Sequence, residues 1–288
     1  MNVFDVPEHL LHSCRESPER MEWLGTLRGI ITDLASRWSL TLEPPFEREV
    51  SCAWVAPGLR GDLPVVLKIG MPHMEAEDEI AGLRFWDGDP TVRLLEADAL
   101  VGAMLLERCV PGSSLRELPE SEQDSIIAKL LRRLWSKRAD AAPFRPLHAL
   151  VSYWSDATLA RANDWPDPAL VHDGLALMQQ LALDNDHPTV PLATDLHAGN
   201  ILRAQRASWL VIDPKPFLGD PAFDATQHLL NCRERLIGNP DQLVGHFCNL
   251  LDVDPMRVRL WLFARAASEP RGRWAPASMS LARLLRPS

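Results

Sequence analysis

Three oxygen-bearing side chains lie close together in the sequence between Thr194 and Pro216. The stretch TDLHAGNIL contains Asp195 and Asn200, and WLVIDPKP follows with Asp213 at the end of an apolar run. Because both stretches are typical of strands, a hairpin would bring the three side chains to one end of a small sheet. Carboxylate and amide oxygens suit Mg²⁺, and a remaining carboxylate can orient and deprotonate a hydroxyl. This combination is what phosphoryl transfer requires.

Each of these residues, taken alone, is also typical of a turn. Side chains of Asp and Asn cap nearby backbone groups, so three separate turns are the simpler interpretation for three separate residues. Their combination on one strand–loop–strand frame favours a site. His197, inside the loop, has two interpretations: contact with a substrate, or a buried histidine that braces the loop, which is the one we expect.

The elements that must position these residues follow from the hydrophobic pattern. Residues 18–38 have helical spacing, and residues 46–69 are typical of two strands joined by the turn-rich GLRGD. A helix is predicted from Pro72 to about Trp86, and two more strands in VRLLEAD and GAMLLERCV. After the linker PGSSL, helices are predicted at about 121–138, 148–163, 167–184, 221–236, 240–251 and 255–267.

This order of elements predicts an α+β protein with two lobes. The N-terminal lobe, residues 1–110, would contain a helix, a small antiparallel sheet and an inserted helix. The C-terminal lobe, residues 111–288, would be mainly helical and would carry the hairpin with its acidic residues. The tail after Ser268 is expected to be loose, because it is rich in proline and arginine.

Composition narrows the classes of partner. The formal net charge of the 288 residues is −9, which argues against binding of a nucleic-acid backbone and suits a cationic small molecule. The five cysteines form no CxxC pair, and neither a signal peptide nor an apolar run of about 18 residues is present. We therefore expect a cytoplasmic protein with reduced thiols. The sequence does not indicate an oligomeric state.

The motif DLHxxN followed by IDP resembles the aminoglycoside phosphotransferase family, a branch of the protein-kinase-like fold. The longer run WLVIDPKPFLGDPAFD resembles its streptomycin 6-phosphotransferase and hydroxyurea phosphotransferase subgroup. The resemblance implies a bilobal kinase that depends on ATP and Mg²⁺, with Asp195 as the catalytic base and Asn200 and Asp213 as metal ligands. Ala193 and Thr194 stand where the family usually has His-Gly, so the contacts that support the loop could differ from those of the family.

The same resemblance implies a phosphate-binding lysine in the N-terminal lobe. Lys68 closes the apolar strand PVVLKIG and is expected to fill this role. A lysine of this kind needs a carboxylate on the following helix. Glu75 and Glu79 would share a face of the predicted helix, and the spacing in the subgroup favours Glu75, with Glu79 as the alternative.

Two further nucleotide contacts are implied by the resemblance. The stretch MLLERCVPGSSL is similar to the connector of the family, so backbone groups near Glu107 to Cys109 are expected to bind the adenine edge. The loop that covers the phosphates would be EVSCAW, which contains no glycine. Ser51 would then offer its hydroxyl and N–H to a phosphate, and a plain surface serine is an equal alternative.

The acceptor is expected to bind near Asp195 in the helical lobe. Asp224, Gln227, His228 and Asn231 share one face of the helix predicted to begin near Pro221. Acidic groups there would pair with the guanidinium arms of streptomycin, although Asp224 has a structural role as its alternative. The leading acceptor is streptomycin or a related aminoglycoside, which would make the protein an antibiotic-resistance kinase.

Other interpretations stay open at this point. The acceptor could instead be hydroxyurea or another small hydroxylated metabolite. A nucleotide-binding regulator with weakened catalysis is a second class, supported by Ala193 and Thr194 alone. A metal-dependent phosphohydrolase is a third class, but it would need neither Lys68 nor an adenine pocket.

Overall fold

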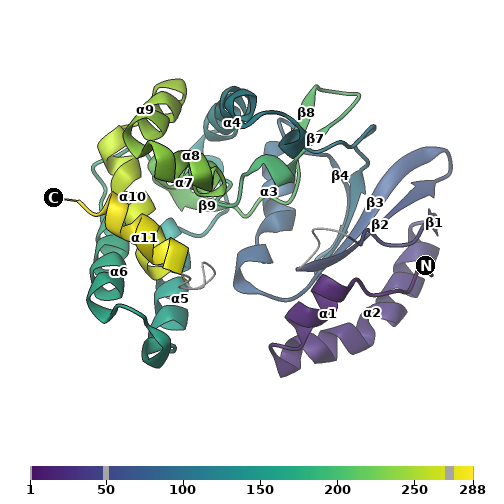
Figure 1. Cartoon of the computed structure of the whole chain (residues 1–288). Helices are drawn as coiled ribbons and strands as arrows, with labels where there is room; N and C mark the ends of the chain where they lie inside the picture. The colour runs from purple at the N-terminus through teal and green to yellow at the C-terminus, as the bar shows by residue number, and fades with distance from the viewer. Residues whose placement is uncertain (1, 48–51, 270–275, 288) are drawn as a thin grey trace. The chain divides into compact units, whose positions relative to one another are not determined.

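The computed structural model of the chain describes residues 2–47, 52–269 and 276–287, which divide into two compact units (Figure 1). Unit 1 comprises Met1–Ser113 and Arg203–Leu210, and unit 2 comprises Ser114–Leu202 and Val211–Ser288. The sequence predicts one change of lobe, after residue 110. The chain instead enters unit 2 after residue 113 and returns to unit 1 for residues 203–210, where Arg206 donates hydrogen bonds to Glu107 and to the carbonyl oxygens of Gly88 and Thr91.

The sheet of unit 1 has five strands in the order β1-β2-β3-β5-β4, all paired antiparallel. Arg60 and Leu63 form the last pair of the central hairpin, so Gly61 and Asp62 alone make its turn, and Gly61 has the positive φ of +60° that such turns favour. The strands are β1 (Leu40–Leu42), β2 (Ala53–Arg60), β3 (Leu63–Gly70), β4 (Leu94–Asp98) and β5 (Ala103–Glu107).

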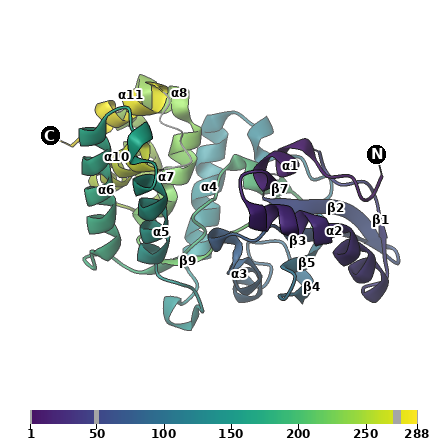
Figure 2. The ribbon, with the colours of Figure 1, turned by 90° about the horizontal axis from the view of Figure 1, so that it is seen from below.

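Two helices, α1 (Glu8–Cys14) and α2 (Pro18–Arg37), pack against one face of this sheet (Figure 2). The apolar side chains of α2 meet Leu67 and Ile69 of β3 in one buried cluster. Because successive side chains of a strand point to opposite faces, Lys68 lies on the other face of the sheet. The core of unit 1 therefore fixes the strand that carries the predicted phosphate-binding lysine.

The helix predicted from Pro72 to Trp86 is shorter than expected. Its first part is a single 3₁₀ turn, η1 (Met74–Ala76), and the α-helix α3 covers only Glu79–Trp86. The N–H of Ala76 donates to the His73 carbonyl oxygen three residues back, so the first part does not continue into α3. Glu75 and Glu79 consequently belong to different elements.

Four of the helices of unit 2, α6, α7, α9 and α10, begin where the sequence has Asp-Pro or Asn-Pro. Asp167, Asp220, Asn239 and Asp254 each accept a backbone N–H with their side chains, and a proline follows each of them at the first helical position. This explains why the starts of these helices were predictable. The helices of unit 2 are α4 (Glu120–Trp135), α5 (Leu147–Leu159), α6 (Pro168–Leu183), α7 (Pro221–Asn231), α8 (Arg233–Gly238), α9 (Pro240–Leu251), α10 (Pro255–Ser268) and α11 (Pro276–Leu285).

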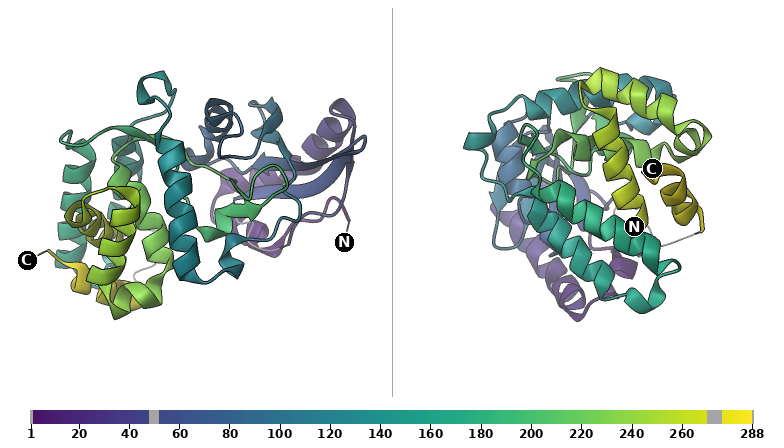
Figure 3. Two further views of the ribbon diagram at one scale, coloured as in Figure 1. Left: turned by 90° about the horizontal axis from the view of Figure 1, so that it is seen from above. Right: turned by 90° about the vertical axis from the view of Figure 1, so that its left-hand side faces the viewer.

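Helices α6 and α10 pack closely side by side in the core of unit 2 (Figure 3). A Cβ atom at Gly174 would lie 2.6 Å from the Ala267 side chain, so only glycine permits this approach. The helix α11 was not expected, because the tail was predicted to be loose. Among the described residues, no helix is long and apolar enough to cross a membrane.

Four short strands frame the loops that carry the predicted site. Strand β6 (Val190–Leu192) pairs with β9 (Phe217–Gly219), and β7 (Ile201–Arg203) pairs with β8 (Trp209–Val211). The loop 193–200 connects β6 to β7, and the loop 212–216 connects β8 to β9. Two-stranded pieces supply few backbone hydrogen bonds, so the loops need other support.

Candidate active site

The two loops of unit 2 are joined to each other by backbone hydrogen bonds. The N–H of Ile212 donates to the carbonyl oxygen of Asn200 at 2.9 Å, and the N–H of Lys215 donates to the carbonyl oxygen of Ala193 at 3.0 Å. The side-chain amide of Asn200 also donates to the backbone oxygen of Asp195 at 2.9 Å. The structure therefore brings the loops of Asp195, Asn200 and Asp213 together, as the hairpin pattern predicts.

Asp224 anchors the start of the first loop and is not exposed to an acceptor. Its carboxylate accepts the N–H groups of Ala193 and Thr194 at 2.9 and 2.7 Å and the indole N–H of Trp135 at 2.9 Å. Burial raises its pKa to about 6, although the three donors oppose this shift. The prediction that Asp224 contacts the acceptor is thus corrected, because its oxygens are buried and occupied.

Thr194 occupies a backbone conformation that usually favours glycine. Its φ is +49°, in the left-handed region, where a β-branched residue is strained. Its hydroxyl donates to the Lys215 carbonyl oxygen at 2.6 Å and links the two loops. Because Asp224 contacts only the backbone N–H groups of Ala193 and Thr194, the presence of these residues in place of the usual His-Gly leaves this anchor intact.

Asp213 forms an ion pair with Lys215 in the second loop. Lys215 is 5% exposed, and Asp213 adopts a φ of +53°. Sequence analysis did not single out Lys215, although it lies in the IDPKP run that carries the family resemblance. The Lys215 ammonium neutralises the Asp213 carboxylate in this arrangement, so a metal ion bound at Asp213 would have to share that carboxylate with Lys215.

His197 braces the first loop, as expected. The N–H of Gly199 donates to its Nδ1 at 3.0 Å, so the proton of the neutral ring is on Nε2. Burial lowers the pKa of His197 to about 4, and the nearby Arg116 cation adds to this effect. A Cβ atom at Gly199 would lie 2.7 Å from the Arg116 guanidinium, which therefore rests directly against the loop.

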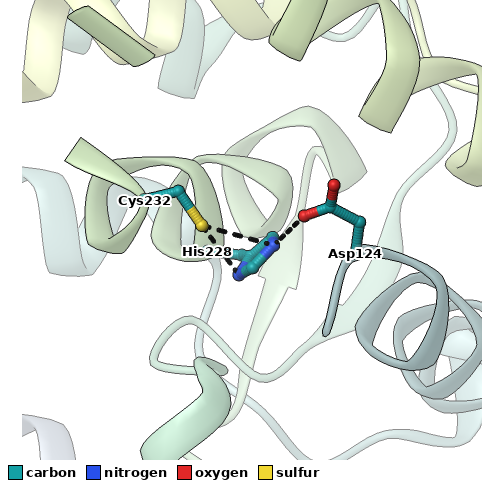
Figure 4. A group of neighbouring side chains, drawn as sticks. All are labelled: Asp124, His228 and Cys232. Carbon is teal, nitrogen blue, oxygen red and sulfur yellow. Dashed lines mark hydrogen bonds and ion pairs between the residues drawn. The ribbon is translucent and has the colours of Figure 1, made fainter. Parts of the chain in front are cut away.

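His228 belongs to a buried cluster and not to an acceptor surface (Figure 4). Its Nε2 lies 2.7 Å from Asp124 Oδ1, and its ring nitrogens lie 3.6 and 3.7 Å from the sulfur of Cys232. Burial would raise the pKa of Asp124, but hydrogen bonds from His228 and Arg235 lower it to about 2. The prediction that His228 binds the acceptor is corrected, since the side chain is buried against Asp124, Cys232 and Phe247.

The Asp124, His228 and Cys232 side chains are near enough to share a metal ion, with ligand atoms within 4.8 Å of one another. Arg235, however, donates to both carboxylate oxygens of Asp124, at 2.7 and 3.1 Å. A second cation at this place would meet the guanidinium charge in a buried setting. Burial also raises the pKa of Cys232 to about 12, which keeps the thiol protonated. The cluster is therefore a structural ion-pair network.

In unit 1, Lys68 is held by Glu79. The Lys68 ammonium donates to both carboxylate oxygens of Glu79, at 2.6 and 2.7 Å, and both side chains are buried. The preference for Glu75 is corrected, because α3 begins at Glu79 and Glu75 lies in the separate turn η1. Glu75 is also buried, with 5% of its surface exposed.

The segment predicted to bind the adenine edge follows β5. The N–H of Glu107 donates to the Arg93 carbonyl oxygen at 3.0 Å, and the Glu107 carboxylate pairs with Arg206. The Glu107 N–H is therefore already occupied within unit 1. Burial raises the pKa of the Cys109 thiol to about 11. Ser51 lies outside the described residues.

A pocket within unit 2 adjoins the loop 193–200. It has a volume of about 590 Å³ and includes Ala198 of the loop and Asn231, one of the predicted acceptor residues. Arg116 contributes a guanidinium group to its lining, and Glu120 contributes a carboxylate. Its other lining residues are Leu118, Pro119, Gln123 and Cys232.

Gln227 is the fourth predicted acceptor residue, and it contacts Asp195. Its side-chain amide donates to Asp195 Oδ1 at 2.6 Å, and Arg265 of α10 donates to its carbonyl oxygen at 2.7 Å. Gln227 lies on the face of α7 that the sequence indicates, but its partner Arg265 is distant in the chain and was not singled out. The only local hint is an arginine inside the apolar stretch FARAAS of α10.

Known proteins resemble this chain over most of its length. The sequence pattern of the aminoglycoside/hydroxyurea antibiotic resistance kinase family matches residues 38–275. The chain is 29% identical to the streptomycin 6-kinase of Streptomyces glaucescens, over 99% of this chain and 98% of that protein. It is 34% identical to the hydroxyurea phosphotransferase of Kitasatospora aureofaciens, over 85% of this chain and 72% of that protein.

The fold is similar to that of solved kinases. A crystal structure of the aminoglycoside phosphotransferase APH(4)-Ia, a thermostable mutant in ternary complex with AMP-PNP and hygromycin B, superimposes with a TM-score of 0.61. The alignment covers 88% of this chain and 95% of that chain at 15% identity, which establishes a shared protein-kinase-like fold. The chain belongs to the aminoglycoside/hydroxyurea antibiotic resistance kinase family and is a small-molecule phosphotransferase.

Proposed function

We propose that the protein transfers the γ-phosphoryl group of ATP to a hydroxyl group of an aminoglycoside, with streptomycin as the leading acceptor. The observation that carries the proposal is the joining of the Asp195, Asn200 and Asp213 loops by backbone hydrogen bonds, with Asp224 buried beneath them. This frame keeps one carboxylate and two oxygen ligands together, as phosphoryl transfer requires.

The residues of the two units have different roles in this proposal. Lys68, oriented by Glu79, binds the α- and β-phosphates in unit 1, and the segment near Cys109 binds the base. Asn200 and Asp213 hold Mg²⁺ in unit 2; the oxygen donors of these side chains suit that ion. Bound Mg²⁺ supplies charge neutralisation of the phosphates. The buried Lys215 keeps Asp213 in place beside the loop.

Asp195 acts as the general base. As the acceptor oxygen forms its bond to the γ-phosphorus and the bond to the ADP oxygen breaks, the hydroxyl proton passes to the Asp195 carboxylate. His197 is neutral in this environment and braces the loop. The substitution of Ala193 and Thr194 for His-Gly does not remove a group with a chemical role here, which favours an active enzyme over a silent regulator.

The acceptor pocket is the hollow lined by Arg116, Glu120 and Asn231. Its volume of about 590 Å³ is in the range of pockets for small molecules. The net charge of −9 and the carboxylate of Glu120 favour a cationic acceptor, and two relatives bear the name streptomycin 6-kinase. The chain is also 34% identical to a hydroxyurea phosphotransferase, so hydroxyurea is the second candidate acceptor.

The test is a screen of acceptors with the purified protein. Streptomycin, other aminoglycosides and hydroxyurea are each incubated with Mg²⁺ and ATP, and products are identified by mass spectrometry. We expect a gain of one phosphoryl group on streptomycin, with equal release of ADP. A product from hydroxyurea alone would replace the first acceptor by the second, and ATP hydrolysis without any phosphorylated product would contradict the proposal.

A further inference from the structure

A chain of hydrogen bonds leads from Asp195 to the interior of unit 2. The Gln227 amide nitrogen lies 2.6 Å from Asp195 Oδ1, and Arg265 Nη2 lies 2.7 Å from the Gln227 amide oxygen. The residues come from the first loop, from α7 and from α10, so the order of contacts does not follow the sequence. Gln227 is partly buried, whereas Arg265 is only 3% exposed.

The orientation of the Gln227 amide is determined by its second partner. A guanidinium group has only donors, so the group of Gln227 that faces Arg265 must be its oxygen. The NH₂ group then faces Asp195 and can only donate to the carboxylate. Arg265 thereby removes the ambiguity between the oxygen and nitrogen of a glutamine side chain.

Arg265 is itself fixed in position. Its guanidinium pairs with Glu269 at 3.1 and 3.2 Å and donates to the hydroxyl oxygen of Thr226. Its Cζ atom also lies 4.8 Å from the centre of the Phe223 ring. A cation held by a carboxylate, a hydroxyl and an aromatic ring has little freedom to rotate away from Gln227.

We propose that Gln227 and Arg265 are positioning residues for Asp195 in phosphoryl transfer, an inference that rests on the proposed function. The amide of Gln227 fixes Oδ1, which sets the direction of the second carboxylate oxygen towards the acceptor hydroxyl. Gln227 therefore acts through Asp195 and does not bind the acceptor directly.

Two substitutions of nearly equal volume separate this role from packing. Gln227→Met keeps the length of the side chain but removes the donor, and Gln227→Glu replaces the donor with a carboxylate beside Asp195. We expect kcat to fall about 10- to 100-fold in Gln227→Met, the effect of losing one hydrogen bond to a charged group, and further in Gln227→Glu. The KM values for ATP and the acceptor should stay within about threefold, since neither substrate is bound by this residue.

A double-mutant cycle with Asp195→Asn distinguishes positioning from a general structural effect. If Gln227 acts through Asp195, then Gln227→Met should leave the residual activity of the Asp195→Asn variant unchanged. A structural defect would instead lower activity by the same factor in both backgrounds. Gln180→Met, on the exposed face of α6, is the matched control and should retain the kcat of the natural protein.

The inference is overturned if Gln227→Met keeps its kcat, or if it raises the acceptor KM and leaves kcat unchanged. If the unsubstituted protein phosphorylates no acceptor, the proposed function is contradicted. The hydrogen bond between Gln227 and Asp195 can then still be tested by a measurement that does not need activity. In ¹H–¹⁵N spectra, the Gln227 amide signals, assigned by their loss in Gln227→Met, should shift in Asp195→Ala. Unmoved signals would contradict the pairing of Gln227 with Asp195.

Discussion

The charged residues of the two units are supported in different ways. In unit 1, the Lys68 ammonium meets the Glu79 carboxylate directly, and the residues lie on a strand and a helix. In unit 2, Asp195, Asn200 and Asp213 lie on or beside two loops, and the buried Asp224 carboxylate accepts two N–H groups of the first loop. Among the described residues, an ion pair therefore orients Lys68 between regular elements, whereas the loops are held by Asp224 together with hydrogen bonds between the loops.

Among the substitutions that test this difference, Asp224→Ala is expected to change the free energy of unfolding most. The substitution leaves two buried backbone N–H groups and the Trp135 indole N–H without their acceptor, so we expect a loss of about 3–5 kcal/mol in the free energy of unfolding. Urea denaturation measures this quantity. Asp224→Asn, which retains one acceptor oxygen, should lie between this variant and the natural protein; equal midpoints for all three would contradict the anchoring role.

The pair in unit 1 can be removed without loss of fold. Lys68→Met alone removes the cation that both Glu79 carboxylate oxygens contact, which costs about 3 kcal/mol of stability. The double variant Lys68→Met/Glu79→Leu should recover most of that stability, because both charges of the buried pair are removed. Its phosphotransfer should stay at least about 100-fold below the natural rate, since the phosphate contact is lost.

Recovery of stability and activity together in this double variant would show that the pair has no part in nucleotide binding. Thermal unfolding and ADP release are measured on the same preparations. Glu75→Gln serves as the comparison for the neighbouring carboxylate and should have the smaller effect on kcat.

The Asp124 cluster is an ion-pair network on regular helices of unit 2. Of the stability changes expected here, that of Asp124→Asn is the smallest. Its carboxyl pKa is lowered to about 2 from an ordinary 3.8, so the ionised form contributes stability above pH 3.8 that is lost as the pH falls through 2. Asp124→Asn should therefore be about 2 kcal/mol less stable than the natural protein at pH 7. This difference should shrink in urea titrations below about pH 4; a difference that is constant from pH 3 to pH 7 would contradict the assignment.

Local patterns predicted the parts of the fold that depend on local physics. Asp-Pro and Asn-Pro pairs marked helix starts because the cap and the proline act within one turn, and the apolar strand before Asp213 placed that residue at a loop. The family resemblance then supplied the roles of the residues, which the sequence pattern alone does not give. His197, expected to brace its loop, does so through Gly199.

Long-range contacts were not predictable in the same way. The choice between Glu75 and Glu79 depended on where α3 begins, and hydrophobic spacing did not reveal the break after η1. Asp224 and His228 lie on the face of α7 that the sequence indicated, but that face is buried by α4 and the loop. The link from Asp195 to Arg265 joins three distant segments, so no local signal encodes it.

The most direct test of the account concerns Asp195 itself. Phosphorylated acceptor is quantified for Asp195→Ala and the natural protein, and binding of Mg²⁺ with a non-hydrolysable ATP analogue is measured for both. The account predicts a fall in transfer of at least about 1,000-fold with analogue affinity unchanged within about threefold, because the base does not hold the nucleotide. Full transfer activity in Asp195→Ala would contradict it.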